Sequence, residues 1–321
     1  MNFRRSEFDV TNRINTTDPV CVKLEVSRIY RTLYSRNQAP VLSCAFDDMV
    51  RLYRGEFPGY ARCDTQYHDI QHVLEVTLAM ARLLDGYERS RGDGPRVDER
   101  TFQLGCICAL YHDMGYIRRL SDKKHRNGAE YTRTHVSRGV RFLKEYLPTI
   151  GMAEVADVAG LILHFTGYER SVESIRMPER IYHLVGSLLG TADIIAQMSD
   201  RCYLEKCRDR LFPEFVAGGI AKRRTEQGEE VVFASADDLL RKTPGFYVSA
   251  TRRLSEDLGS AYRYAQTHFG GGVNLYMDAV KQNIRFVERF NGRGEIVLRR
   301  QPPVTCEPAY TWGSPPSQSV N

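Results

Sequence analysis

Six side chains of the kinds that bind metal ions follow one another along the middle of this chain, each in an apolar segment with helical spacing. Buried imidazoles and carboxylates are costly in apolar surroundings unless a cation or a hydrogen-bond donor compensates them. We therefore expect the fold to bring these side chains together, where four or more would hold one or two divalent cations and leave positions open for water and substrate. The six are His72, His112, Asp113, His135, His164 and Asp193.

Apolar residues recur at helical intervals along most of the chain. In residues 68 to 84, for example, Ile70, Val73 and Leu74 fall on one helix face. No strand-like alternation persists, and the polar stretch 218 to 232 is predicted to be a loop. We expect an all-α helical bundle with additional N- and C-terminal helices. Its expected parts are a helical N-terminal segment (1–66), a metal-binding core (67–205), a C-terminal helical extension (206–300) and a Pro- and Ser-rich tail predicted to be disordered (301–321).

Capping and helix-breaking residues predict where the helices end. Gly86 is expected to end the helix that begins at residue 68, and Asp98 to cap the next one. Pro148 is expected to stop a later helix, and Pro178 to precede the start of another. These later helices are predicted over residues 99–111, 128–146, 153–165 and 181–198, and helical periodicity returns over 235–268 and 273–291.

Composition predicts an ordinary globular protein. The 45 Lys and Arg residues against 40 Asp and Glu give a dispersed net charge of +5, which does not predict a nucleic-acid partner. The eight cysteines show no paired CxxC spacing, which favours reduced thiols. No stretch approaches the roughly 20 apolar residues of a membrane span, and the N-terminus has no apolar signal region. We expect a cytoplasmic protein with no membrane partner.

The first chemical motif is Tyr67-His68-Asp69-Ile70-Gln71-His72. Two histidines four residues apart on one helix project from the same face about 5.4 Å apart. One could bind a metal ion while the other faces the leaving group of a substrate. Taken alone, the pair could equally be ordinary surface or packed histidines.

The second motif is the doublet His112-Asp113 at the end of a long apolar helix. Adjacent helical residues point in different directions, so both could bind one cation only at a helix end or a distortion, where Met114-Gly115 places them. Asp113 could instead be a cap or part of a buried ion pair. Asp193, between Leu188-Leu189 and Ile194-Ile195, indicates a compensating cation or donor most strongly. His135 could also be an exposed helix histidine, since arginines flank it.

In this order, the skeleton His72, His112-Asp113, Asp193 resembles the HD-domain metal-dependent phosphohydrolases over about residues 67 to 205. The first motif is similar to the Tyr-His-Asn-x-x-His signature of cyclic-nucleotide phosphodiesterases, with Asp69 in place of Asn. The segments that begin at His112, His135 and His164 are similar to the HD-GYP branch, which cleaves cyclic dinucleotides. The chain also differs from the HD-GYP branch at three positions. Tyr116, Phe165 and Glu169 stand where the HD-GYP branch has Lys, a second His and Pro.

The resemblance implies a di-metal hydrolase that cleaves a phosphoester, with a nucleotide or cyclic nucleotide as the expected substrate. His72, His112, Asp113 and Asp193 would hold the first cation. Asp113, His135 and His164 would hold the second, and the metals would be Mn, Mg, Fe or Zn. His68 would protonate the leaving oxygen. Two other functions stay open: a di-iron oxygenase, because some proteins of this fold bind iron through the same six ligands, and a nucleotide-binding regulatory module without turnover.

Three further residues are candidates for substrate binding. Arg118 and Lys123 follow the His-Asp doublet directly, in a basic stretch that would suit phosphate charge. A solvated loop is the alternative explanation for that stretch. Gln197 lies one helical turn after Asp193 on the same face, where its amide could hydrogen-bond a ligand.

Overall fold

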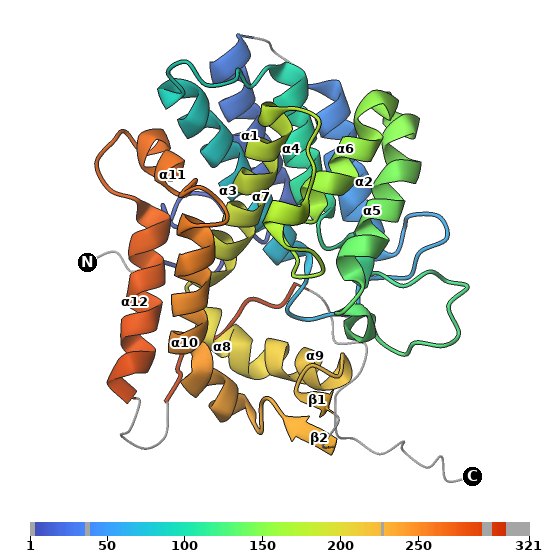
Figure 1. Ribbon diagram of the computed structural model, residues 1–321, viewed down its shortest axis with the longest axis vertical. Helices are drawn as coiled ribbons and strands as arrows, with labels where there is room; N and C mark the ends of the chain where they lie inside the picture. The colour runs from blue at the N-terminus through green and yellow to red at the C-terminus, as the bar shows by residue number, and fades with distance from the viewer. Residues whose placement is uncertain (1–3, 36–38, 226–227, 291–296, 306–321) are drawn as a thin grey trace.

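The computed structural model describes residues 4–35, 39–225, 228–290 and 297–305 (Figure 1). It confirms the all-α prediction, because helices make up most of these residues. The helices are α1 (Pro19–Tyr34), α2 (Pro40–Arg54), α3 (Ile70–Ser90), α4 (Glu99–Tyr111), α5 (His135–Tyr146), α6 (Ala156–Leu163), α7 (Arg180–Ser199), α8 (Tyr203–Lys206), α9 (Phe212–Ala217), α10 (Ala236–Ser255), α11 (Arg263–His268) and α12 (Leu275–Phe290).

Helices α3, α4 and α7 form the centre of the bundle and are buried on nearly every side. Their apolar residues are distributed around the whole helix rather than along one stripe, as is typical of helices enclosed by others. Helix α3 packs against α1, α4, α7 and α11, while α5 and α6 pack against each other. Helices α10 and α12 lie side by side on the left of Figure 1, and α12 also packs against α7. The C-terminal extension is thus joined to the core along its length.

The structure corrects the predicted start of α3. Asp69 is the N-cap residue, and its carboxylate accepts a hydrogen bond from the backbone N of His72 at 3.0 Å. Aspartate suits this position because its oxygen satisfies an N–H that has no partner within the helix. His68 therefore lies before the helix, and the prediction that His68 and His72 share one helix face is wrong.

The predicted end of α3 at Gly86 is also wrong, because the helix continues to Ser90. A Cβ atom at Gly86 would lie 1.8 Å from the backbone O of Tyr264, which belongs to α11. Glycine at this position permits the close approach of α11 to α3.

Replacing Gly86 with alanine is expected to lower the free energy of unfolding by about 1 to 3 kcal/mol, the usual cost of overpacking a core. Chemical denaturation measures this change. Gly245 is the matched control, since it also lies inside a helix, α10, and a Cβ there would meet nothing within 4 Å. Gly245→Ala should leave stability unchanged or raise it by up to about 1 kcal/mol. Equal losses in both variants would contradict the packing explanation.

Other helix boundaries differ from prediction for local reasons. The segment 128–146 contains a 3-10 turn before α5, and the segment 153–165 begins with another 3-10 turn and ends its helix at Leu163. The segment 235–268 is interrupted between α10 and α11. Asp98 caps α4 as predicted, accepting from the N of Thr101 at 2.8 Å.

A short antiparallel hairpin occupies the region predicted to be a loop. Strand β1 (Lys222–Thr225) pairs with β2 (Gly228–Val231). Ion pairs across the hairpin join Lys222 to Glu229 at 2.8 Å and Arg223 to Glu230 at 2.6 Å. The sequence pattern missed these strands because their side chains are mostly charged, so no alternation of apolar and polar residues marks a buried face.

The predicted disordered tail lies outside the described residues from 306 onward. Its first residues, 301–305, contact the core. The backbone O of Pro303 accepts a hydrogen bond from Arg210 at 2.5 Å, and the hydroxyl of Thr305 donates to the carboxylate of Asp69. The chain thus returns to the N-cap of α3.

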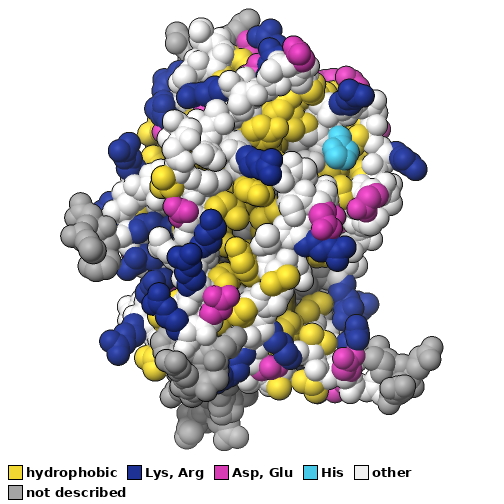
Figure 2. Space-filling model, turned by 60° about the vertical axis from the view of Figure 1, so that its left-hand side comes forward, with side chains coloured by type: hydrophobic (Ala, Val, Ile, Leu, Met, Phe, Trp, Pro, Cys, Tyr) yellow, Lys and Arg dark blue, Asp and Glu magenta, His cyan; other side chains and the backbone are white. Residues whose placement is uncertain are grey.

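The surface agrees with the dispersed charge of the sequence. Lys and Arg side chains are spread over the whole face seen in Figure 2, among apolar and neutral ones. In the parts of the chain that are described, no helix combines the length and the apolar character that crossing a membrane requires. The seven cysteines described there are free thiols.

Candidate metal centre

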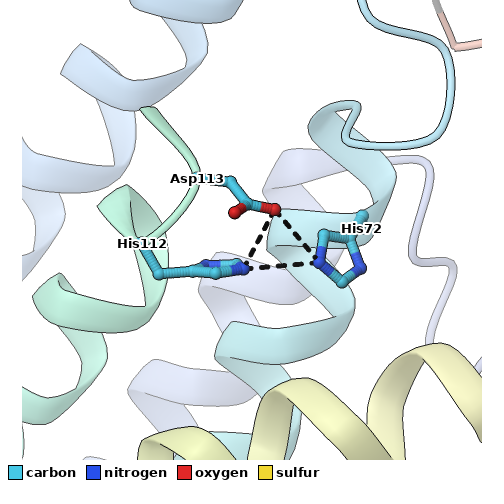
Figure 3. A group of neighbouring side chains, drawn as sticks. All are labelled: His72, His112 and Asp113. Carbon is cyan, nitrogen blue, oxygen red and sulfur yellow. Dashed lines mark hydrogen bonds and ion pairs between the residues drawn. The ribbon is translucent and has the colours of Figure 1, made fainter. Parts of the chain in front are cut away.

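Three of the predicted metal ligands meet at one point in the core (Figure 3). The Nε2 atoms of His72 and His112 lie 3.3 Å apart, and Asp113 Oδ2 lies 3.3 and 3.2 Å from them. His72 comes from the first turn of α3. His112 and Asp113 follow the last residue of α4, where the chain leaves the helix, so both side chains turn toward His72. The prediction that the doublet lies at a helix end is confirmed.

Asp193 completes a group of four from the buried helix α7. Its Oδ1 lies 3.4 Å from His72 Nε2 and 3.8 Å from His112 Nε2. The Nε2 of Gln197, one turn later, lies 3.5 Å from the same oxygen, and the Oε1 of Gln197 accepts from the hydroxyl of Tyr67 at 3.1 Å. Helix α7 therefore supplies one carboxylate and an amide that orients it.

The hydrogen bonds of two histidines leave their Nε2 atoms free to bind a cation. The Nδ1 of His112 lies 2.8 Å from the backbone O of Ala109, and the Nδ1 of His135 lies 2.8 Å from the backbone O of Thr132. A carbonyl oxygen only accepts, so each Nδ1 carries the proton and each neutral ring has its lone pair on Nε2. This arrangement is typical of metal-binding histidines, whose second nitrogen donates to a carbonyl or carboxylate.

The carboxylate of Asp113 provides a test of whether a cation fits. Its Oδ2 is buried and accepts no hydrogen bond of good geometry, although two imidazole nitrogens lie near it. A buried carboxylate oxygen in this state is costly. Two imidazoles and one carboxylate at one point, with a second carboxylate beside the imidazoles, are suitable ligands for a divalent transition metal ion. The residues present therefore fit a metal ion.

The charges of the group affect one another strongly. Burial by itself would lower the pKa of His72, but the neighbouring carboxylates of Asp113 and Asp193 outweigh it and raise that pKa to about 10. Burial by itself would raise the pKa of Asp113, but His112 and His72 hold it well below its ordinary value. The carboxylate is thus ionised, as a metal ligand must be.

His135 lies on the other side of Asp113. It is the first residue of α5, and its Nε2 is 3.7 Å from Asp113 Oδ1. Gly115 allows this approach, because a Cβ atom there would lie 1.8 Å from the backbone O of His135. Burial lowers the pKa of His135, which favours the neutral ring. The glycine of the predicted His-Asp-Met-Gly motif therefore has a packing role.

His164 lies apart from the other five predicted metal ligands. It follows the last residue of α6 and is buried, and its Nδ1 has no hydrogen-bond partner. Within the described residues it contacts no other predicted ligand. The next residue, Phe165, packs closely against Gly186 of α7, where a Cβ would lie 2.6 Å from its ring. Of the three ligands predicted for a second cation, only Asp113 and His135 lie close to each other.

His68 lies beside the candidate metal-binding group and has an acidic partner. Its Nδ1 is 2.6 Å from Glu214 Oε2, and the other oxygen of Glu214 accepts from the backbone N of Tyr67 at 2.5 Å. Burial alone would lower the pKa of His68, but the charge and hydrogen bond of Glu214 raise it. Tyr116 stacks on His68 with ring centres 4.2 Å apart, and on His135 at 4.5 Å. These contacts fix the His68 ring near the cluster.

A cavity of about 570 Å³ opens onto these residues. Gln197 lines it, together with His68, His72, Asp113, His135 and Asp193. Such a volume is typical of small-molecule sites.

The predicted substrate-binding residues Arg118 and Lys123 do not line this cavity. Arg118 instead donates to Asp64 at 2.9 Å, and Lys123 donates to the backbone O of Leu120 at 3.2 Å. The basic stretch is a loop held by its own contacts. The cations that line the cavity are Arg133 and Lys242.

The most important residue that the sequence reasoning missed is Glu214. It lies in α9 among apolar neighbours, Phe212, Phe215 and Val216. The same signal that marked Asp193, a carboxylate in an apolar segment, was present there.

Compared with protein-family models, curated proteins and solved structures, the chain matches none of them.

Proposed function

We propose that this protein is a metal-dependent phosphohydrolase of the HD-domain type. One observation carries the proposal: His72, His112, Asp113 and Asp193 come from distant parts of the sequence and meet at the edge of a cavity. The two imidazole Nε2 atoms lie 3.3 Å apart, and each lies 3.2 to 3.8 Å from a carboxylate oxygen of Asp113 and of Asp193. Their order along the chain is that of the HD skeleton. The buried and ionised state of Asp113 supports the same conclusion.

The four residues would hold the cation through two Nε2 atoms and one oxygen of each carboxylate. A divalent ion there would polarise a phosphoryl oxygen and lower the pKa of water. Asp113 Oδ1 and His135 would provide part of a second site. His164 has no contact with either of them among the residues described, so the six-ligand set of a di-iron oxygenase has less support.

His68 is the proposed proton donor to the leaving oxygen. Glu214 favours the protonated ring by its charge, and Tyr116 restricts the orientation of that ring. General acid catalysis requires a proton-carrying group that reaches the leaving atom. His68 lines the cavity together with His72 and Asp113, which supports this role.

The test is hydrolysis by the purified protein after loading with manganese, magnesium, iron or zinc. Turnover is expected with bis(p-nitrophenyl) phosphate. A panel of nucleotides and cyclic nucleotides is assayed beside it, because the resemblance makes these the first natural compounds to try. A chelator should stop turnover, and added metal should restore it. An iron-dependent optical spectrum with dioxygen consumption would support the oxygenase instead, and nucleotide binding without turnover would support the regulatory module.

Replacing His68 with asparagine is expected to slow hydrolysis about 100-fold, within the range that a general acid contributes, while the metal content stays that of the wild type. Glu214→Gln should cause a smaller loss, because it removes the charge but keeps an acceptor. Initial rates and metal analysis measure both effects. His125 is the matched control, since it also pairs with a carboxylate, that of Asp122, at 3.0 Å but does not line the cavity. An equal loss in His125→Asn would reject the role of His68.

A further inference from the structure

One wall of the cavity is apolar and comes from the C-terminal extension. We call it the apolar wall: Leu211, Phe215, Phe233, Leu239 and Phe246. Leu211 and Phe215 come from the helical turns before and within α9, Phe233 follows β2, and the other two belong to α10. The rings of Phe215 and Phe233 stack with centres 5.6 Å apart. The extension thus presents a packed apolar surface to whatever occupies the cavity.

Several polar side chains that line the cavity beyond the proposed metal ligands are already bonded within the chain. The hydroxyls of Thr132, Thr166 and Thr243 donate to backbone carbonyls at 2.6, 2.9 and 3.2 Å. Lys242 donates to the O of Val232 at 2.7 Å and to Asp238 at 2.8 Å. These donors are used by the protein itself. The organic part of a ligand would therefore find few donors to recognise polar groups.

The amide of Gln197 is also hydrogen-bonded within the chain: it accepts from the hydroxyl of Tyr67 and donates to the carboxylate of Asp193. Arg133 differs: it donates to the O of Gly219 at 2.9 Å and pairs with no carboxylate among the residues described. Its remaining N–H groups suit an anionic oxygen. The cavity accordingly combines sites for negative charge with an apolar wall.

We propose that the organic group of the substrate is apolar, so that the substrate class is a phosphoester of an alkyl or aryl alcohol. This inference rests on the proposed function only in taking the substrate to be a phosphoester; the apolar character of its organic group is argued from the cavity. The phosphoryl group would occupy the metal end of the cavity, and the organic group would be buried against the apolar wall. Affinity would then grow with apolar area, by about fourfold for each methylene that is buried.

The test uses alkylphosphonates from methyl- to octylphosphonate, which resemble the substrate and cannot be hydrolysed at the phosphorus–carbon bond. Calorimetric titration of the metal-loaded protein should give affinities that rise with chain length until the wall is covered. A flat series, or no binding of any member, would overturn the proposal. So would a nucleoside monophosphate that binds more than tenfold tighter than octylphosphonate.

The same series separates this inference from the proposed function. Length-dependent binding with no hydrolysis of the matching p-nitrophenyl alkyl phosphates would keep the apolar site and reject the hydrolase. Hydrolysis at equal kcat/KM for every chain length would keep the hydrolase and reject the apolar site.

Phe246 provides the variant, because it lines the cavity but is 39% exposed, so its loss should not prevent folding. Phe246→Ser is expected to weaken octylphosphonate binding about tenfold, in keeping with the value of burying an aromatic ring, and to leave methylphosphonate binding unchanged. Val248 is the control, since it lies on the same helix, is 67% exposed and does not line the cavity. Equal weakening by Val248→Ser, or none by Phe246→Ser, would contradict the assignment of the wall.

Discussion

Replacing Asp113 with asparagine is expected to remove metal binding and hydrolysis together. The carboxylate faces His72 and His112 through one oxygen and His135 through the other, so it contributes charge to every part of the group. Asparagine keeps the shape but not the charge. A catalytic cation supplies several kcal/mol of transition-state stabilisation, and each 1.4 kcal/mol is a factor of ten, so the rate should fall at least about 1,000-fold.

Metal content by mass spectrometry and initial rates measure the two losses. Asp157 is the matched control: its side chain is 92% exposed and pairs with Lys144 at 2.8 Å on the surface. Asp157→Asn should keep both the metal and the activity. A full complement of metal in Asp113→Asn would show that Asp113 is not a ligand.

The second large effect is expected on folding stability, at the buried ion pair of Asp9 and Arg82. Their side chains are only 3% and 2% exposed, and Arg82 Nη2 lies 2.5 Å from Asp9 Oδ2. Arg82 also donates to the hydroxyl of Tyr276 at 2.9 Å. The pair therefore joins the N-terminal segment to α3 and α12. Asp9→Asn keeps an acceptor for the backbone but leaves the arginine charge unpaired, which should cost about 3 to 5 kcal/mol.

Denaturant unfolding of two further variants tests the cause of this loss. Asp47→Asn is the surface control, because Asp47 pairs with Lys23 and is 66% exposed, and it should cost less than about 1 kcal/mol. Replacing Arg82 with methionine in the Asp9→Asn protein should recover part of the loss, since no charge then remains buried. A double variant that is less stable than Asp9→Asn would contradict this explanation.

The pair also predicts how stability depends on acid. Burial alone would raise the pKa of Asp9, but Arg82 and the backbone N–H of Ile14 outweigh it and lower the pKa below its ordinary value. A carboxyl of this kind contributes stability above the pKa of an unfolded aspartate, about 3.9, and the contribution is lost as the pH falls through the lowered pKa. Below about pH 4, the wild type should therefore lose stability more steeply with acid than Asp9→Asn.

The central helices were predictable because their signals are local. Asp98 caps α4, and the helix is apolar all round, so both its start and its burial follow from adjacent residues. Asp193 was predictable for a related reason, since a carboxylate within an apolar helix needs a partner wherever the helix lies. These arguments require no knowledge of the tertiary fold.

The residues that were missed depend on contacts between distant parts of the chain. Glu214 reaches His68 only because α9 folds back over the core, and the start of α3 at Ile70 depends on which of several polar residues caps it. Arg118 and Lys123 have the right charge, but the loop that carries them satisfies their donors away from the cavity. Charge pattern indicates a phosphate partner only when the backbone also presents the charge to the site.

Glu214 comes from the C-terminal extension, and this limits which fragments of the protein could keep the proposed activity. The proposed metal ligands all precede residue 205, yet Glu214, whose carboxylate contacts the proposed acid His68, and the apolar wall of the cavity both follow it. A fragment cut at that position would carry the cation-binding group with an unpaired His68 and an open side. The proposed chemistry therefore depends on helices from both sides of residue 205, and we expect changes in the later helices to alter reactivity even where every proposed ligand is kept.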